Sequence, residues 1–259
     1  MTPGRLKAAA KAALIHFSGG VVVAGLAAGL IFGLWFPYPY NVILGGNTLF
    51  LLLCGVDVVC GPILTLVLYS PTKARPKWLL DIFLILLVQF SALIYGLHSI
   101  TLTRPVWLAF EGDRLRIVKA VEVHAQYLAQ AQPGLTVLPW TGPRLIAVRA
   151  LEKSDPEFLE SVQRAVQGDF ASFYPQRWIA YEQRSEEVRQ LLYPLASLEN
   201  RQGTAALREL IENKTGLSAA QQDAQLGYLP LVQGATLDWV AVLDRTTALP
   251  VAYGYVDGW

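Results

Sequence analysis

A carboxylate stands in a part of the sequence that is otherwise suited to lipid. Residues 12–56 contain no Asp, Glu, Lys or Arg, and Asp57 then precedes a further apolar stretch that reaches residue 69. An ionised side chain at the centre of a membrane helix costs at least ~2.5–3.5 kcal/mol. We therefore expect Asp57 to face other helices, to be protonated, or both. Its chemistry would be proton transfer or hydrogen bonding between helices.

Two polar residues of the next apolar stretch are the expected partners of this carboxylate. If the two stretches form antiparallel helices, Ser91 lies at about the depth of Asp57 and Gln89 lies slightly deeper. The pattern predicts an intramembrane polar cluster of Asp57, Gln89 and Ser91. Its simplest role is to hold two helices together, although a proton relay or a contact with another protein's helix stays open. His16, at the start of the first apolar stretch, is interpreted as an interface residue.

A helix breaker follows Asp57 on the same stretch. Gly61 and Pro62 predict a helix kink, because proline has no backbone N–H and its ring clashes with the carbonyl of Val58. Thr65 or a neighbouring helix is expected to satisfy that carbonyl.

Glycines recur every four residues in the first apolar stretch. Gly25, Gly29 and Gly33 fall on one face of a helix, and such a stripe lets another helix approach closely. We interpret the stripe as a helix-packing or partner-binding surface. Either the other helices of this chain or the membrane helix of a partner protein could fill it.

The rest of the sequence shows no known catalytic or metal-binding pattern. His98 and His124 are isolated, and there is no HExxH, CxxC, GxSxG, phosphate-binding loop or dinucleotide fingerprint. We therefore expect no enzyme activity, no catalytic residue, no cofactor and no metal ion. Cys54 and Cys60 would point to different sides of a helix and are not expected to form a disulfide.

Composition divides the chain in two. The whole sequence is 53% hydrophobic and 16% charged, but charges are frequent only from Arg104 onward. We expect a three-helix transmembrane domain at 1–100 and a soluble domain at 101–259. The soluble part holds fifteen basic and eighteen acidic residues, and this nearly neutral balance argues against nucleic-acid binding.

Three apolar windows are long enough for membrane helices, at about 14–36, 49–69 and 79–100. The N-terminal tail and the loop 70–77 each carry three basic residues, whereas the loop 37–48 carries none. Basic loops stay in the cytoplasm, so the N-terminus is expected inside and the soluble part outside. In a Gram-negative cell the protein would lie in the inner membrane with its second domain in the periplasm.

The soluble part is expected to be an α+β domain with a small, mostly antiparallel sheet. Residues 106–123 predict a hairpin, and the segment from 227 to the C-terminus predicts three short strands. Between them, 178–195 and 203–216 have helical spacing, and Gly216 can end the second of these helices.

Several motifs of both parts resemble the TfpX/TfpZ family of type IV pilin accessory proteins. In the membrane part they are HFS (16–18), WFPYPY (35–40), LFLLLCGVDVVCGPILTLVLYSPTK (49–73) and DIFLILLVQFSALIYG (81–96). In the soluble part, FEGDRLRIVKAVEV and the closing LDRTTALPVAYGYV follow the same pattern. The resemblance implies an inner-membrane accessory protein or chaperone that binds a cognate type IV major pilin and promotes pilus assembly, without a catalytic step.

The expected partners are the membrane helix and the periplasmic head of that pilin, together with the lipid bilayer; a homodimer stays open. Two other function classes also stay open. One is a membrane enzyme that modifies pilin or envelope lipid, with Asp57 or His16 as acid or base. The other is an envelope-sensing signalling subunit. The first would need a catalytic cluster in the outer domain, and the second a cytoplasmic output domain, and the sequence shows neither.

Overall fold

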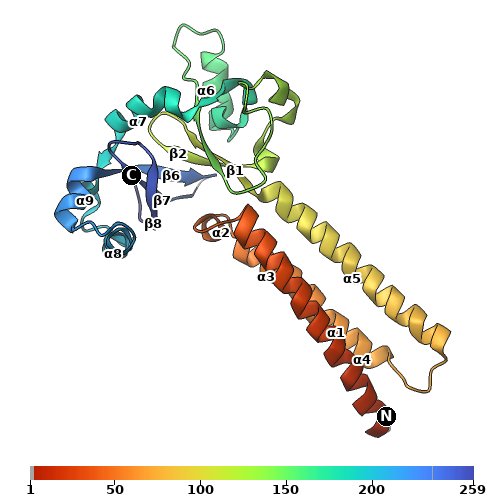
Figure 1. The fold of residues 1–259 in the computed structure, drawn as a ribbon. Coiled ribbons are helices and arrows are strands. Elements are labelled where there is room, and N and C mark those ends of the chain that lie inside the picture. Colours follow the sequence, from red (N-terminus) through yellow and green to blue (C-terminus); the bar gives the residue numbers. More distant parts are fainter. Residues whose placement is uncertain (1–2, 235) are drawn as a thin grey trace. The chain divides into compact units, whose positions relative to one another are not determined.

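The computed structural model describes residues 3–234 and 236–259. The chain folds into two compact units, Met1–Arg104 and Pro105–Trp259. Figure 1 shows long helices in the first unit and a sheet with shorter helices in the second. The fold class expected from the sequence, membrane helices plus an α+β region with a mostly antiparallel sheet, is confirmed.

Three long helical segments build the first unit, and each is long and apolar enough to cross a membrane. The first ends just before Pro37, and the third has Pro76 in its first turn, where a missing N–H is tolerated. The chain is therefore a membrane protein. Its elements in order are α1 (Pro3–Leu30), the π-helical turn η1 (Ile31–Trp35), α2 (Tyr40–Ile43), α3 (Gly46–Cys54), the π-helical turn η2 (Gly55–Cys60), α4 (Gly61–Leu68) and α5 (Arg75–Thr103).

The observed helices cover nearly all of the expected apolar windows and begin earlier. They span Pro3–Trp35, Gly46–Leu68 and Arg75–Thr103. The residues added at the start of the first and third helices include Lys and Arg, which favour helix without adding an apolar signal, whereas the second helix adds Gly46, Asn47 and Thr48. The apolar windows therefore mark the part of each helix that is suited to lipid, and the helices themselves extend beyond these windows.

The helices of the first unit pack tightly near η1. Ile31, Phe36, Leu53 and Ile100 share one buried apolar cluster. Gly96 on α5 makes room for this cluster, because a Cβ atom there would lie 2.4 Å from Leu53 Cδ1. Farther from η1, α1 stays side by side with α4 (Figure 1).

The breaker Gly61–Pro62 is accommodated by a widened turn. The helix runs from η2 directly into α4, and Pro62 occupies the first turn of α4. A π-helical turn bonds the carbonyl of residue i to the N–H of residue i+5. For Asp57 that residue is Pro62, which has no N–H. The free carbonyl that the sequence placed on Val58 therefore belongs to Asp57, because the turn has the π register.

An eight-stranded mixed sheet forms the centre of the second unit, in the order β4-β3-β1-β2-β6-β7-β8, with β5 paired to β6 off this path. The pairs β1–β3 and β2–β6 are parallel, and the other described pairs are antiparallel. The strands are β1 (Pro105–Phe110), β2 (Leu115–Lys119), β3 (Arg144–Val148), β4 (Trp178–Ala180), β5 (Tyr193–Pro194), β6 (Leu226–Gln233), β7 (Thr236–Asp244) and β8 (Pro250–Tyr255).

The hairpin and the three closing strands expected from the sequence are confirmed as β1–β2 and β6–β8. The expectation of a helix throughout 178–195 is wrong. Trp178 instead begins β4, which pairs with β3 at the edge of the sheet, and the helix starts only at Ser185. The aromatic and β-branched residues Trp178 and Ile179 favour a strand where a neighbouring strand is available.

Four described α-helices accompany the sheet, namely α6 (Phe158–Val166), α7 (Ser185–Leu191), α8 (Thr204–Thr215) and α9 (Ala219–Gln225). Gly216 ends α8 with φ 73°, as expected from the sequence. The apolar residues of this unit form two buried clusters. In one, the rings of Trp107 and Trp178 meet edge to face at 5.4 Å, and in the other Ile211 of α8 packs with Tyr228.

Candidate functional site

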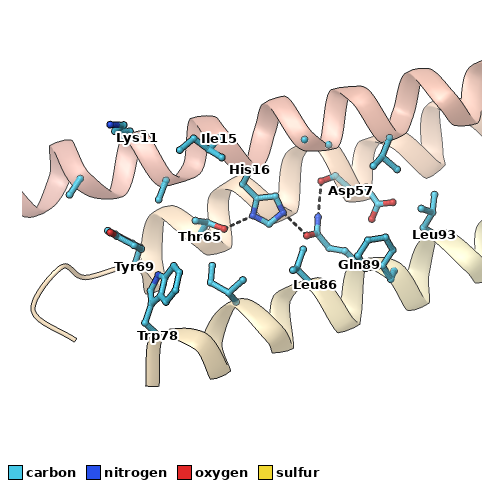
Figure 2. A pocket seen from close by; sticks show the side chains of 17 residues that line it. Lys11, Ile15, His16, Asp57, Thr65, Tyr69, Trp78, Leu86, Gln89 and Leu93 are labelled. Atoms are coloured by element: carbon cyan, nitrogen blue, oxygen red, sulfur yellow. Dashed lines mark hydrogen bonds between the residues drawn. The ribbon is translucent and has the colours of Figure 1, made fainter. Parts of the chain in front are cut away.

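A pocket of about 680 Å³ opens in the membrane unit, where α1, the α4 segment and α5 face one another (Figure 2). Most of its wall is apolar or small. Polar side chains nevertheless come from all three helical segments. They are Lys11, His16, Asp57, Thr65, Tyr69 and Gln89.

His16 connects the three helical segments by hydrogen bonds. Its Nδ1 lies 2.6 Å from Thr65 Oγ1 on α4, and its Nε2 lies 2.7 Å from Gln89 Oε1 on α5. The Nε2 of Gln89 in turn donates to the main-chain carbonyl of Asp57 at 2.9 Å. Figure 2 shows the ring of His16 between the two side chains that it contacts. The sequence placed His16 at the interface, and it instead bridges α4 and α5.

The hydrogen bonds of a neutral His16 run in one direction. Because the amide N–H of Gln89 donates to Asp57, its Oε1 must accept, so Nε2–H of His16 donates to it. Nδ1 then carries the lone pair and accepts from the hydroxyl of Thr65. The chain ends on the carbonyl that Pro62 deprives of a backbone donor. Both ring nitrogens are thus occupied, and the network holds three helices together.

Gly61 gives Gln89 the space to reach this carbonyl. A Cβ atom on Gly61 would lie 2.2 Å from Gln89 Nε2. The Gly-Pro pair therefore has two distinct consequences. Pro62 leaves the carbonyl of Asp57 without a donor, and Gly61 admits the side chain that supplies one.

The predicted cluster of Asp57, Gln89 and Ser91 forms only in part. Gln89 reaches Asp57 through the main chain of Asp57, whereas Ser91 lies on the exposed side of α5. Two residues along a helix turn by about 200°, so Gln89 and Ser91 cannot face the same neighbour. The missing members are His16 and Thr65. The sequence offered one signal that could have identified them. Both are polar residues inside apolar stretches, and both lie one to two helical turns from a basic segment.

The carboxyl group of Asp57 faces the pocket rather than this network. Its Oδ1 is buried and has no hydrogen-bond partner among the described residues. Buried acceptors without a partner are uncommon, since each forfeits the hydrogen bonds it would make in water. Asp57 thus lines the pocket with a carboxyl oxygen that no described group satisfies.

The glycine stripe lies open on α1 and η1. Gly25, Gly29 and Gly33 are all exposed, and a Cβ atom added to any of them would meet no described atom within 4 Å. The described helices of this chain therefore do not fill the stripe.

A second polar cluster lies in the second unit, which its composition predicts to be soluble (hereafter the soluble unit), beside a pocket of about 210 Å³. His124 Nε2 lies 2.9 Å from Asp169 Oδ1, and the hydroxyl of Tyr174 donates to the other oxygen of the same carboxyl. His124, judged isolated from sequence, thus has a partner 45 positions away. Burial raises the pKa of Asp169, but the hydrogen bonds from His124 and Tyr174 outweigh it, so the net pKa is lowered. Burial and the bond to Asp169 raise the pKa of Tyr174.

The arrangement in the soluble unit suits a structural tie more than a reaction centre. The rings of His124 and Tyr174 lie 4.3 Å apart, and the guanidinium of Arg164 lies 4.9 Å from the centre of the Tyr174 ring. These contacts join the loop after β2 to the segment before β4. Among the described residues, no group of three His, Cys, Asp or Glu side chains is placed to hold a metal ion.

Comparisons with known proteins place the sequence among bacterial fimbrial proteins. The profile of the family described as "Fimbrial assembly protein FimB" matches residues 4–45, which hold α1, η1 and α2. The fimbrial assembly protein of Dichelobacter nodosus serogroup I is 36% identical over 257 residues, covering 97% of this chain and 97% of that protein. The serogroup E1 protein of the same organism is 36% identical over 253 residues, with 97% of each chain covered.

A shorter relative, the Dichelobacter nodosus fimbrial assembly protein of serogroups C1 and C2, is 44% identical over 131 residues, which is 51% of this chain and all of that protein. No solved structure matches this chain.

Proposed function

This chain belongs to the family of fimbrial assembly proteins and acts in fimbria biogenesis, and from that premise we propose that it binds a cognate type IV major pilin and promotes its assembly. In this proposal it is an accessory protein or chaperone of the TfpX/TfpZ kind. It holds a membrane-anchored pilin subunit by its membrane helix and by its head. No catalytic step is involved.

The observation that carries the pilin contact is the uncovered glycine stripe. Gly25, Gly29 and Gly33 offer a face without side-chain bulk that no described helix of this chain occupies. Without water, membrane helices associate chiefly through close packing and hydrogen bonds, and small residues permit close approach. The separate soluble unit, Pro105–Trp259, offers a second surface for the pilin head.

The proposed location is the inner membrane, with the N-terminus in the cytoplasm and the soluble unit in the periplasm. In support, the two basic segments lie at the same end of the membrane unit. The guanidinium of Arg5 donates to the carbonyls of Tyr69 at 3.4 Å and Val67 at 3.2 Å, and Lys73 pairs with Asp81. Positive charge gathered at one end is typical of the cytoplasmic side.

Co-purification from native membranes tests this function. The full chain, tagged and expressed with its cognate major pilin, is expected to retain the pilin after mild detergent extraction. Gly29→Leu is expected to reduce the retained pilin several-fold, because the leucine side chain fills the open face. The matched control is Ser91→Leu, which places the same side chain on the exposed side of α5. Equal retention by both variants would remove the stripe from the interface, and no retention by the unmodified chain would reject pilin binding.

A further inference from the structure

Gly29 of the glycine stripe also belongs to a longer face of α1. Small or apolar residues recur along α1 at alternating intervals of four and three, as Ala8, Ala12, Ile15, Gly19, Val22, Leu26 and Gly29. This alternation keeps one face turned toward a partner in a left-handed helix pair. From Ala8 to Gly29 the face is about 32 Å long at 1.5 Å per residue. That length matches the hydrocarbon core of a bilayer, roughly 30 Å.

The first half of this α1 face forms one wall of the membrane pocket. Ala8, Ala12, Ile15 and Gly19 all line it. The opposite wall comes from α5, where Ile82, Leu86 and Phe90 contribute. The second half of the face is open, and Val22 and Leu26 are 63% and 72% exposed. The pocket wall and the open surface therefore lie along one face of α1.

The composition of this α1 face favours a helix over a lipid chain. Four of its seven residues are Gly or Ala, and a Cβ atom added to Gly19 or Gly29 would meet nothing described within 4 Å. A helix can bring its backbone close to such positions and gain packing and weak backbone hydrogen bonds. Flexible acyl chains cover flat and grooved surfaces alike, so they do not require this pattern.

The Asp57 carboxyl indicates what the occupant must carry. Asp57 lines the pocket, and its Oδ1 has no hydrogen-bond partner among the described residues. An acyl chain has no donor to offer. A membrane helix with an N–H, O–H or cationic group at this depth would satisfy the oxygen, and complementary polar groups fix the depth and rotation of paired helices.

We propose that the membrane helix of the partner packs along the α1 face from Ala8 to Gly29, enters the cleft between α1 and α5, and donates a hydrogen bond to Asp57. This assignment rests on the proposed pilin-binding function and names where the helix sits. His16, Thr65 and Gln89 fix the positions of the three helices around this cleft, because they tie α1 to both α4 and α5.

Photocrosslinking in native membranes tests the assignment. The full chain carries p-benzoylphenylalanine in place of Val22, which is 63% exposed on the α1 face, or in place of Val88, which is 64% exposed on α5. Neither residue lines the pocket, so the pair compares two equally exposed helix faces. With pilin co-expressed, Val22 is expected to give the pilin adduct in clear excess over Val88. Adducts of Val22 to lipid alone, or to a second copy of this chain alone, would overturn the assignment.

Asp57 variants then test the hydrogen bond. Asp57→Asn keeps a carbonyl acceptor and is expected to preserve most of the pilin adduct at Val22. Asp57→Leu removes the acceptor and is expected to lower the adduct about threefold to tenfold, the range that interhelical hydrogen bonds cover in membranes. Membrane abundance of each variant serves as the folding control. Equal adduct yields from well-inserted Asn and Leu variants would reject the role of Asp57.

Co-purification separates the two levels of the proposal. If pilin co-purifies with the unmodified chain while Val22 gives no pilin adduct, pilin binds elsewhere and the α1 face is rejected. If pilin neither co-purifies nor crosslinks, the proposed function itself fails.

Discussion

The membrane unit and the soluble unit keep their elements together by different means. In the soluble unit large side chains such as Trp178 and Ile146 are fully buried against the sheet. In the membrane unit most apolar side chains face outward, and three hydrogen bonds around His16 and Gln89 connect the helices. Burial of apolar surface drives folding in water, whereas lipid is as apolar as leucine and supplies no such drive. Single polar groups and glycines therefore matter more in the membrane unit.

The largest effect is expected from breaking the soluble core. Trp178 is 1% exposed, and its indole N–H donates to the carbonyl of Ser172 at 2.7 Å. Trp178→Ala should destabilise the soluble unit by about 3–5 kcal/mol, because it leaves a cavity and an unpaired acceptor. Denaturant unfolding of the full chain in detergent, followed by protease resistance of the soluble unit, measures this. Trp140→Ala, at a position 60% exposed, is the control and should change little.

A smaller effect should follow from closing the space beside Gln89. Gly61→Ala places a Cβ atom where Gln89 Nε2 now lies, so the side chain must leave both of its partners. We expect a loss of about 1–3 kcal/mol, from overpacking and lost hydrogen bonds. Unfolding of the purified protein in mixed micelles measures it. Gly55→Ala is the matched control, because an added Cβ there meets nothing described within 4 Å. Equal stability of the two variants would show that Gln89 needs no such space.

The hydrogen bonds themselves can be separated from the packing. Gln89→Leu keeps the volume and removes the bonds to His16 and Asp57, so it should cost about 1 kcal/mol, within the range measured for bonds between membrane helices. A double-mutant cycle with His16→Leu should show positive coupling between the two positions. Additive losses in that cycle would mean that the contact at 2.7 Å contributes nothing to stability.

The smallest effect is expected from acid on the soluble unit. The pKa of Asp169 is lowered in the folded protein, so its contribution to stability is fully present above the ordinary carboxyl pKa of ~3.9 and is lost as the pH falls below that value and through the lower pKa of the folded protein. The side chain is 32% exposed, so we expect less than about 1 kcal/mol.

Thermal melting between pH 6 and pH 3 measures the contribution of Asp169, and Asp169→Asn should flatten that part of the curve. A variant whose melting temperature falls as steeply as that of the unmodified chain would assign the acid sensitivity to other carboxyls.

Local patterns predicted much of the fold. Apolar windows located the three membrane helices, and alternation with turn residues located β1, β2 and the strands β6–β8. The strand β4 was missed because its three residues are decided by pairing with β3, a contact distant in sequence. Propensity is a weak guide wherever a neighbouring strand supplies the hydrogen bonds.

The candidate site was less accessible to sequence reasoning. Asp57 and Gln89 were found because polar residues are conspicuous in apolar stretches. The contacts of His16 with Thr65 and Gln89 were not predicted, because they depend on how α1 is rotated about its own axis. Packing against the other helices sets that rotation, and the sequence of one segment does not reveal it. The sequence predicted a free carbonyl on Val58, whereas the structure has it on Asp57. The difference comes from the π-helical register of η2, which leaves no signal in the composition.

The π-helical turn η2 also fixes the angular phase of the second rod. A π turn accommodates one residue more than an α-helical path of the same length, so everything beyond it is rotated by about 100° relative to an uninterrupted α-helix. Deleting a single residue between Gly55 and Cys60 would leave the composition almost unchanged. It would let the rod wind as a regular α-helix with Thr65 still on the side that α1 faces. The unshortened sequence wound as an uninterrupted α-helix would instead turn Thr65 away, and the two halves of the rod would no longer contact the same neighbours.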